Sequence, residues 1–276
     1  MQKSFEIKSA KPEHYPQLKA LWLMCFPDED EQALNNFFEK SVTPENIIAT
    51  FFGEQVINAM YLLESEIVLR GNRYSALYVY GVCTHPEYRG KGLMKTAFKY
   101  LDKLVVLKNI DYLFHVPSTD SLFEMYASLG YKVGFTYEKS EVCYDEVFST
   151  DGHTESFTYD KYLQLRKKYC SDASGYATLK QNAFNSFYYP VGEELNVICT
   201  NNGYCVFGVE NKKITVYEYF GENGFKLPYS GDYEKNCSVE LRKPSLNGNG
   251  IPFGMYKSFG NAPEIKNAFF GVPYGG

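Results

Sequence analysis

The segment from Thr84 to Met94 holds the residues whose types and spacing best fit chemistry on an anion. It joins an expected strand to a long amphipathic stretch, and it contains Gly90 and Gly92. Backbone N–H groups at the start of a helix have no acceptor within the helix, and glycines let the chain come close to an oxyanion. The sequence therefore predicts a site for a pyrophosphate group at this junction.

Three cations, Arg89, Lys91 and Lys95, surround the two glycines. Each could pair with a phosphate or with the ribose phosphate of a coenzyme. The alternative is that they form the solvated face of a helix. Two glycines before a helix occur often, so the specificity of the signal lies in the whole string that begins at Val82.

This string resembles the central motif of the GNAT acetyltransferases, in which Arg or Gln, two residues, Gly, one residue and then Gly or Ala bind a pyrophosphate. Met94 stands where that last small residue is usual, and it either narrows the loop or points into the core. The resemblance implies acetyl-CoA as the co-substrate. The residues expected to bind it here are Arg89, Gly90, Lys91, Gly92, Leu93, Met94 and Lys95, with the backbone of Val82, Cys83 and Thr84 aligning the pantetheine arm like an added strand. GNAT enzymes transfer the acyl group directly, so Cys83 is not expected to be a nucleophile.

The stretch from Val116 to Tyr131 is similar to the late helix of the same family, in the subgroup that resembles the two-domain enhanced-intracellular-survival acetyltransferases. The resemblance implies that Tyr126 protonates the departing CoA thiolate, because a phenol with a pKa of about 10 suits such a leaving group. Thr119 or Asp120 stands where the family usually has an Asn, and we count Thr119 among the cofactor-binding residues.

A base must take a proton from the attacking amine, because an alkylamine is protonated at pH 7. Glu64, Glu66 and His115 are candidates by residue type and position. Two-unit GNAT relatives suggest another source, which here is the C-terminal carboxylate of Gly276. The sequence leaves the choice open.

The elements expected to position these residues alternate between strands and helices. In the first half, patterns of period two and period 3.6 predict strands at 5–9, 47–52, 56–63, 74–83, 112–116, 131–137 and 140–148, and helices at 12–26, 90–108 and around 122–129, with another helix ending near 38. In the second half they predict a helix from 159 and strands at 195–200, 204–209 and 214–220, and the fragment 252–257 looks like a closing strand.

These patterns and the resemblance predict a mixed α/β (α+β) fold with a splayed, mostly antiparallel sheet. We expect residues 1–150 to form the acetyl-CoA-binding GNAT domain. Residues 151–276 repeat the order of helix and antiparallel strands but lack a counterpart of the Arg89 to Met94 segment. They are expected to be a degenerate GNAT-like domain that shapes the acceptor pocket.

Composition limits the partners. The formal charge of −5 offers no basic field for nucleic acid, and no apolar run is long enough for a membrane span. Seven scattered cysteines show no paired metal-type spacing, so we expect no metal and a reduced, cytoplasmic location. An oligomer is possible.

The predicted function is transfer of an acetyl group to a primary amine of a small molecule or a peptide. The rival is a CoA-binding sensor or scaffold that has lost turnover. Aminoacyl transfer from tRNA on a related fold is disfavoured, because the sequence lacks a basic surface and keeps the pyrophosphate loop intact.

The hypothesis for the Gly276 carboxylate predicts the effect of a truncation. Removal of the last few residues should abolish turnover and leave CoA affinity nearly unchanged, because only the base is lost. Steady-state kinetics and a CoA titration measure the two quantities. Full turnover by the truncated chain would contradict the hypothesis.

Overall fold

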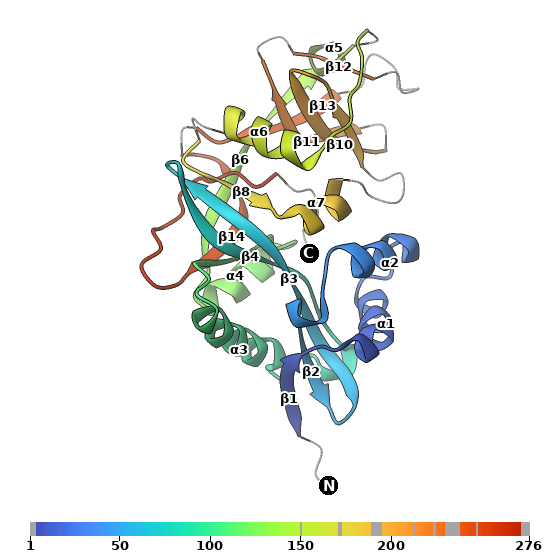
Figure 1. Cartoon of the computed structure of the whole chain (residues 1–276), viewed down its shortest axis with the longest axis vertical. Helices are drawn as coiled ribbons and strands as arrows, with labels where there is room; N and C mark the ends of the chain where they lie inside the picture. Colours follow the sequence, from blue (N-terminus) through green and yellow to red (C-terminus); the bar gives the residue numbers. More distant parts are fainter. Residues whose placement is uncertain are drawn as a thin grey trace.

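One large sheet runs through the molecule (Figure 1). The computed structural model describes residues 4–149, 151–170, 173–188, 195–211, 213–222, 225–229, 238–246 and 248–271, and within these ranges twelve strands form this sheet. Their order is β1-β2-β3-β4-β5-β14-β6-β13-β11-β10-β9, and β8 pairs with β3. Most neighbouring strands are antiparallel, as predicted.

The first half follows the expected order of elements. Its strands are β1 Phe5–Ser9, β2 Ile47–Phe52, β3 Gln55–Leu69, β4 Asn72–Thr84, β5 Tyr112–His115 and β6 Lys132–Cys143. Its α-helices are α1 Tyr15–Cys25, α2 Glu31–Lys40, α3 Leu93–Leu107 and α4 Asp120–Ser128, and short 3-10 helices cover Pro12–His14, Pro44–Asn46 and Pro86–Tyr88. α3 begins three residues later than predicted, because Gly90 and Gly92 both have positive φ.

Two helices cover each face of this half of the sheet (Figure 1). α1 and α2 bury Trp22 and Phe37 in a core on one face, whereas α3 and α4 bury Leu101 and Tyr126 in a second core on the other. Side chains along a strand alternate between faces, so Tyr78 of β4 enters the first core and Val79 the second. The sheet is therefore buried on both sides here.

β4 and β5 pair in parallel over only a few residues and then separate. The last paired residues are Tyr78 and Phe114, although β4 continues to Thr84. β4 also bulges where it pairs with β3, and Gly81 in the bulge has φ +57°. A Cβ at Gly81 would collide with the Trp22 ring, so this position requires glycine. The separation of β4 from β5 confirms the predicted splay.

The second half adds strands to the same sheet. Its strands are β7 Phe148–Ser149, β8 Tyr176–Leu179, β9 Asn196–Cys199, β10 Gly203–Glu210, β11 Lys213–Gly221, β12 Leu227–Pro228, β13 Ser238–Pro244 and β14 Ile251–Ser258, and its helices are α5 Tyr144–Val147, α6 Tyr159–Tyr169 and α7 Gln181–Tyr188. β14 lies between β5 and β6 and is antiparallel to both. The sheet is thus continuous across residue 150, and the division of the chain there stays a prediction.

The prediction of two strands at 131–137 and 140–148 is wrong. β6 runs without a break from Lys132 to Cys143, and the chain then forms α5. The residues between the two expected strands, Glu138 and Lys139, have no turn-forming glycine, proline or asparagine, so nothing local ends the strand. Its second part pairs with β13, and β14 takes the place beside β5.

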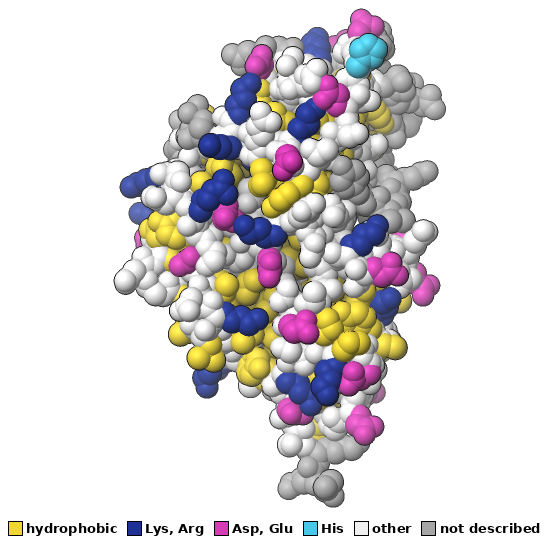
Figure 2. Space-filling model, viewed as in Figure 1, with side chains coloured by type: hydrophobic (Ala, Val, Ile, Leu, Met, Phe, Trp, Pro, Cys, Tyr) yellow, Lys and Arg dark blue, Asp and Glu magenta, His cyan; other side chains and the backbone are white. Residues whose placement is uncertain are grey.

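On the face shown in Figure 2, cationic and anionic side chains are interspersed, and neither sign of charge dominates. Among the described residues, no helix is both long and apolar enough to cross a membrane.

A buried ion pair joins α6 to β11. Arg166 and Glu218 are in contact, and neither side chain is exposed. Arg166 also donates to Ala177 O at 2.7 Å, while Glu218 accepts from the hydroxyls of Tyr188 at 2.8 Å and Tyr204 at 2.6 Å. These bonds offset the desolvation of both charges, which would be costly if either partner were alone.

The stability of the protein should therefore depend on the presence of both partners of this ion pair. Arg166→Met leaves Glu218 buried without its cation, and we expect the free energy of unfolding to fall by about 3–5 kcal/mol. Urea unfolding measures it. Arg166→Met combined with Glu218→Leu should recover part of the loss, because no charge stays buried, although the hydroxyls of Tyr188 and Tyr204 lose their acceptor. Lys132→Met, which breaks the exposed pair with Glu264, should leave the unfolding midpoint almost unchanged. An equally small effect of Arg166→Met would contradict this account.

Candidate active site

A pocket of about 480 Å³ lies where the end of β4 meets the first turn of α3. It brings together most of the residues predicted to bind the cofactor. Its lining consists of Cys25, Phe26, Val82, Cys83, Thr84, Tyr88, Arg89, Gly90, Gly92, Leu93, Met94, Lys95 and Leu122. Met94 both lines the pocket and packs against the core under α3, so its side chain serves as an apolar wall.

The glycine loop presents the start of α3 to this pocket. Gly92, at φ +72°, is the N-cap of α3, and its carbonyl accepts from Thr96 N at 3.1 Å. The N–H groups of the first turn therefore point out of the helix without an intrahelical acceptor. No atom beyond the neighbouring residues lies within 4 Å of where a Cβ would stand at Gly90 or Gly92. A ligand could approach the backbone closely here, and the helix dipole favours an anion.

The three predicted cations take different positions. Arg89 lines the pocket, and its Nε donates to Thr84 O at 3.1 Å, which orients the guanidinium. Lys95 lines the pocket from the first turn of α3. Lys91 is absent from the lining, because its Nζ lies over the Tyr88 ring, 4.7 Å from the ring centre.

The end of β4 is held from one side and open on the other. Cys83 and Thr84 pair with Ala59 and Asn58 of β3. The buried Asn58 amide also donates to Cys83 O and to Thr84 Oγ1, each at 2.8 Å. In the described part of the chain no strand pairs with the opposite edge beyond Tyr78. That edge has backbone groups available to a ligand.

Tyr126 lies one helical turn deeper than the pocket lining. Leu122 of α4 reaches the pocket, and Tyr126 follows it on the same helix, 6% exposed. Burial raises the pKa of Tyr126 above its ordinary value. The pKa of Tyr78 is raised first by burial and then by Tyr126. The two phenols belong to different cores, Tyr78 to the one under α1 and α2 and Tyr126 to the one under α3 and α4.

Besides Lys91, the described residue Thr119 was predicted to bind the cofactor and lies outside the pocket lining. Thr119 is the N-cap of α4, where its Oγ1 accepts from Leu122 N at 3.4 Å, and it does not line the pocket. Gly276 lies outside the described residues, which end at Gly271. Its suggested role stays a prediction.

Sequence reasoning missed the pocket wall that comes from the other face of the sheet. Cys25 and Phe26, at the end of α1, line the pocket more than fifty residues before the glycine loop. The only signal for them was the helical spacing of apolar residues in this segment. Such spacing indicates which residues are buried, but it does not indicate which part of the chain they contact.

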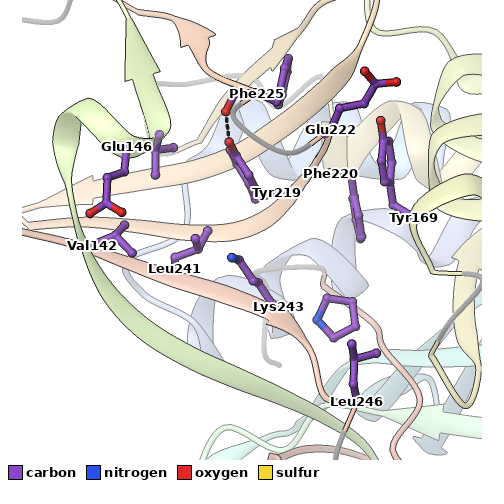
Figure 3. Close-up of a pocket in the computed structure, with 13 residues that line it drawn as sticks. Val142, Glu146, Tyr169, Tyr219, Phe220, Glu222, Phe225, Leu241, Lys243 and Leu246 are labelled. Carbon is purple, nitrogen blue, oxygen red and sulfur yellow. Dashed lines mark hydrogen bonds between the residues drawn. The ribbon is translucent and has the colours of Figure 1, made fainter.

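A second cavity of about 480 Å³ lies in the other half of the sheet (Figure 3). Tyr169, Tyr219, Phe220 and Phe225 form much of its wall, and Tyr219 donates to the carbonyl of Phe225. It contains none of the predicted site residues. The pocket at β4 and α3 is therefore the better candidate for the active site.

Comparisons with known proteins identify a family domain in the first half of the chain. The family model for the GNAT acetyltransferase domain matches residues 6–134, which include the β4 edge, the glycine loop and Tyr126. A search of curated protein sequences gives no match.

Solved structures share the fold over nearly the whole chain. A GCN5-related N-acetyltransferase from Kribbella flavida superposes with a TM-score of 0.69 at 15% identity, covering 93% of this chain and 71% of that protein. One from Anabaena variabilis gives 0.69 at 14%, covering 92% and 73%. Eis1 from Mycobacterium abscessus gives 0.59 at 10%, covering 90% and 66%.

At these identities the likeness shows the fold alone, and the match to the family model is confined to residues 6–134. Residues 6–134 therefore match the GNAT acetyltransferase domain, and this match covers slightly less than half of the 276 residues.

Proposed function

We propose that the protein transfers an acetyl group from acetyl-CoA to a primary amine on a small molecule or a peptide. The observation that supports this most is the pocket between the open edge of β4 and the start of α3. It combines donors for a pyrophosphate with backbone groups for an extended chain. Both parts lie within a domain of an acetyltransferase family.

The residues of the pocket fit CoA by shape and charge. The open space in front of Gly90 and Gly92 accommodates a pyrophosphate, with Arg89 and Lys95 beside it. The edge of β4 from Val82 to Thr84 offers N–H and C=O groups to the amides of a pantetheine arm. Acetyl-CoA, when bound, supplies an acyl group activated as a thioester.

Tyr126 is the proposed general acid. The phenol is protonated at neutral pH even at its ordinary pKa of about 10, so it can donate this proton to a thiolate leaving group. Tyr126 follows Leu122, a residue of the pocket lining, by one turn of α4, which supports a role next to a ligand in the pocket.

The described candidates for the base are weak. Burial lowers the pKa of His115 to about 3, and its ring centre lies 3.7 Å from that of Tyr126, so the imidazole is neutral and a poor proton acceptor. Glu66 already pairs with Arg73 and Lys180. Glu64 is exposed at another cavity, beside Lys180. Solvent and the C-terminal carboxylate of Gly276 are the other candidates for the base.

The glycine loop provides a test of CoA binding with a matched control. Gly92→Ala and Gly71→Ala both place a Cβ at strongly positive φ, +72° and +81°, in open space. Each should lower stability by about 1–2 kcal/mol. Only Gly92→Ala should weaken CoA binding, by tenfold or more in calorimetric titration, since its methyl group occupies the proposed pyrophosphate position. Equal CoA affinities for the two variants would contradict the assignment.

Tyr126→Phe tests the general acid. We expect release of free CoA from acetyl-CoA, in the presence of a panel of amines, to fall about 10²- to 10⁴-fold, while CoA affinity stays near that of the wild type. Tyr131→Phe removes a neighbouring buried hydroxyl and should keep most of the turnover. Wild-type protein that binds CoA but releases no thiol with any amine would favour the sensor instead.

A further inference from the structure

Two cysteines meet at the wall of the proposed CoA pocket. Cys25 is the last residue of α1, and Cys83 lies near the end of β4. Both line the pocket, and the Cys25 thiol contacts the carbonyl of Thr84, the residue that follows Cys83. All described cysteines are free thiols, and the others lie outside this pocket.

Arg89 places a cation on the same pair. The Cys25 thiol donates to Thr84 O at 3.4 Å, and Arg89 Nη2 donates to Cys25 Sγ at 3.8 Å. Arg89 Nε holds the same Thr84 carbonyl at 3.1 Å, so the guanidinium is fixed over the sulfur. A cation beside a partly exposed thiol is the setting in which cysteines become reactive.

The two thiols differ in character. The hydrogen bond from Cys83, and then Arg89, lower the pKa of Cys25 to about 6 despite its partial burial. The same contact with Cys25, together with burial, raises the pKa of Cys83. Besides these groups, Tyr61 of β3 faces the pair, and its own pKa is raised mainly by burial. Cys25 is therefore suited to be the attacking thiolate, with Cys83 as its thiol neighbour.

We infer that Cys25 and Cys83 form a redox-active dithiol, which a hydroperoxide oxidises to a disulfide across the pocket wall. The effect of this disulfide on CoA binding rests on the proposed function, whereas the formation of the disulfide does not. A reducing compartment would keep such a pair as thiols except during oxidation.

The reaction balances in two steps. The Cys25 thiolate attacks the hydroxyl oxygen of the hydroperoxide, so that an S–O bond forms and the O–O bond breaks. The second oxygen leaves as hydroxide or alkoxide and takes a proton from solvent to become water or an alcohol. The Cys83 sulfur then attacks the Cys25 sulfenic acid. The S–S bond forms, the S–O bond breaks, and the hydroxide leaves as water with the proton of Cys83. The two thiols lose two electrons, which the peroxide gains.

The disulfide should oppose cofactor binding. Cys83 belongs to the β4 edge proposed to align pantetheine, and a bond to α1 would pull that edge toward the opposite wall. A phosphate near Arg89 would in turn compete with the Cys25 thiolate for the same cation. CoA binding and disulfide formation are linked equilibria. If the disulfide weakens CoA binding by a given factor, bound CoA lowers the equilibrium constant for forming the disulfide by the same factor.

The full chain is treated with hydrogen peroxide and then alkylated, and peptide masses are mapped. We expect a peptide pair joined through Cys25 and Cys83, with the loss of two hydrogen atoms, that reductant reverses. Cys25→Ser and Cys83→Ser should each abolish it, whereas Cys143→Ser, at an exposed cysteine outside the pocket, should not. Circular dichroism before treatment shows that each variant is folded.

The link to the pocket is measured on the same samples. The oxidised wild type should bind CoA at least tenfold more weakly than the reduced protein. In a thiol–disulfide redox buffer, saturating CoA should lower the equilibrium constant for forming the cross-link by the same factor. Cys25→Ser should bind CoA equally with and without peroxide. Absence of the cross-link, or a cross-linked protein with unchanged CoA affinity, would overturn the inference. Failure of the reduced protein to bind CoA would instead contradict the proposed function, because the cross-link is read from masses alone.

Discussion

The candidate site depends on the separation of β4 from β5 after Tyr78 and Phe114. Within a closed sheet, the backbone groups of residues 79–84 would be used by a neighbouring strand. Because β5 diverges, these groups border a gap, and the loop that follows β4 brings the start of α3 to the same place. One break in strand pairing therefore produces both the extended edge and the anion site.

The second half of the chain holds the other side of this gap in place. β14 pairs with β5 and β6, so it anchors the strand that diverges from β4. Farther along, Phe270 packs edge-on against both Tyr78 and Phe114, each with ring centres 5.0 Å apart, at the point where the strands part. A Cβ at Gly271 would collide with Glu218, so the tail lies directly on the buried ion pair. The ion pair and the splay are thus connected through a few residues.

Local features of the sequence could be predicted, whereas long-range pairing could not. The glycine loop was recognisable because Gly90 and Gly92 sit in one short segment with Arg89, and their positive φ depends on the backbone alone. The continuous β6 was missed because its partners, β13 and β14, lie about a hundred residues later. Thr119 was assigned to the cofactor because of its place in the resemblance, although its local position as an N-cap accounts for its hydroxyl. The contribution of α1 to the pocket required the packing of the whole sheet.

The bulge at Gly81 connects the cofactor edge to the dithiol. Tyr78 and Tyr80 face the core under α1 and α2, and strict alternation would turn Cys83 toward α3. The bulge inserts one extra residue, so Val82 faces α3 and Cys83 faces α1, where Cys25 lies. Only glycine fits beneath Trp22 at this point. Gly81 therefore both shapes the end of β4 and turns the Cys83 thiol toward the end of α1. A change at this position would alter both features.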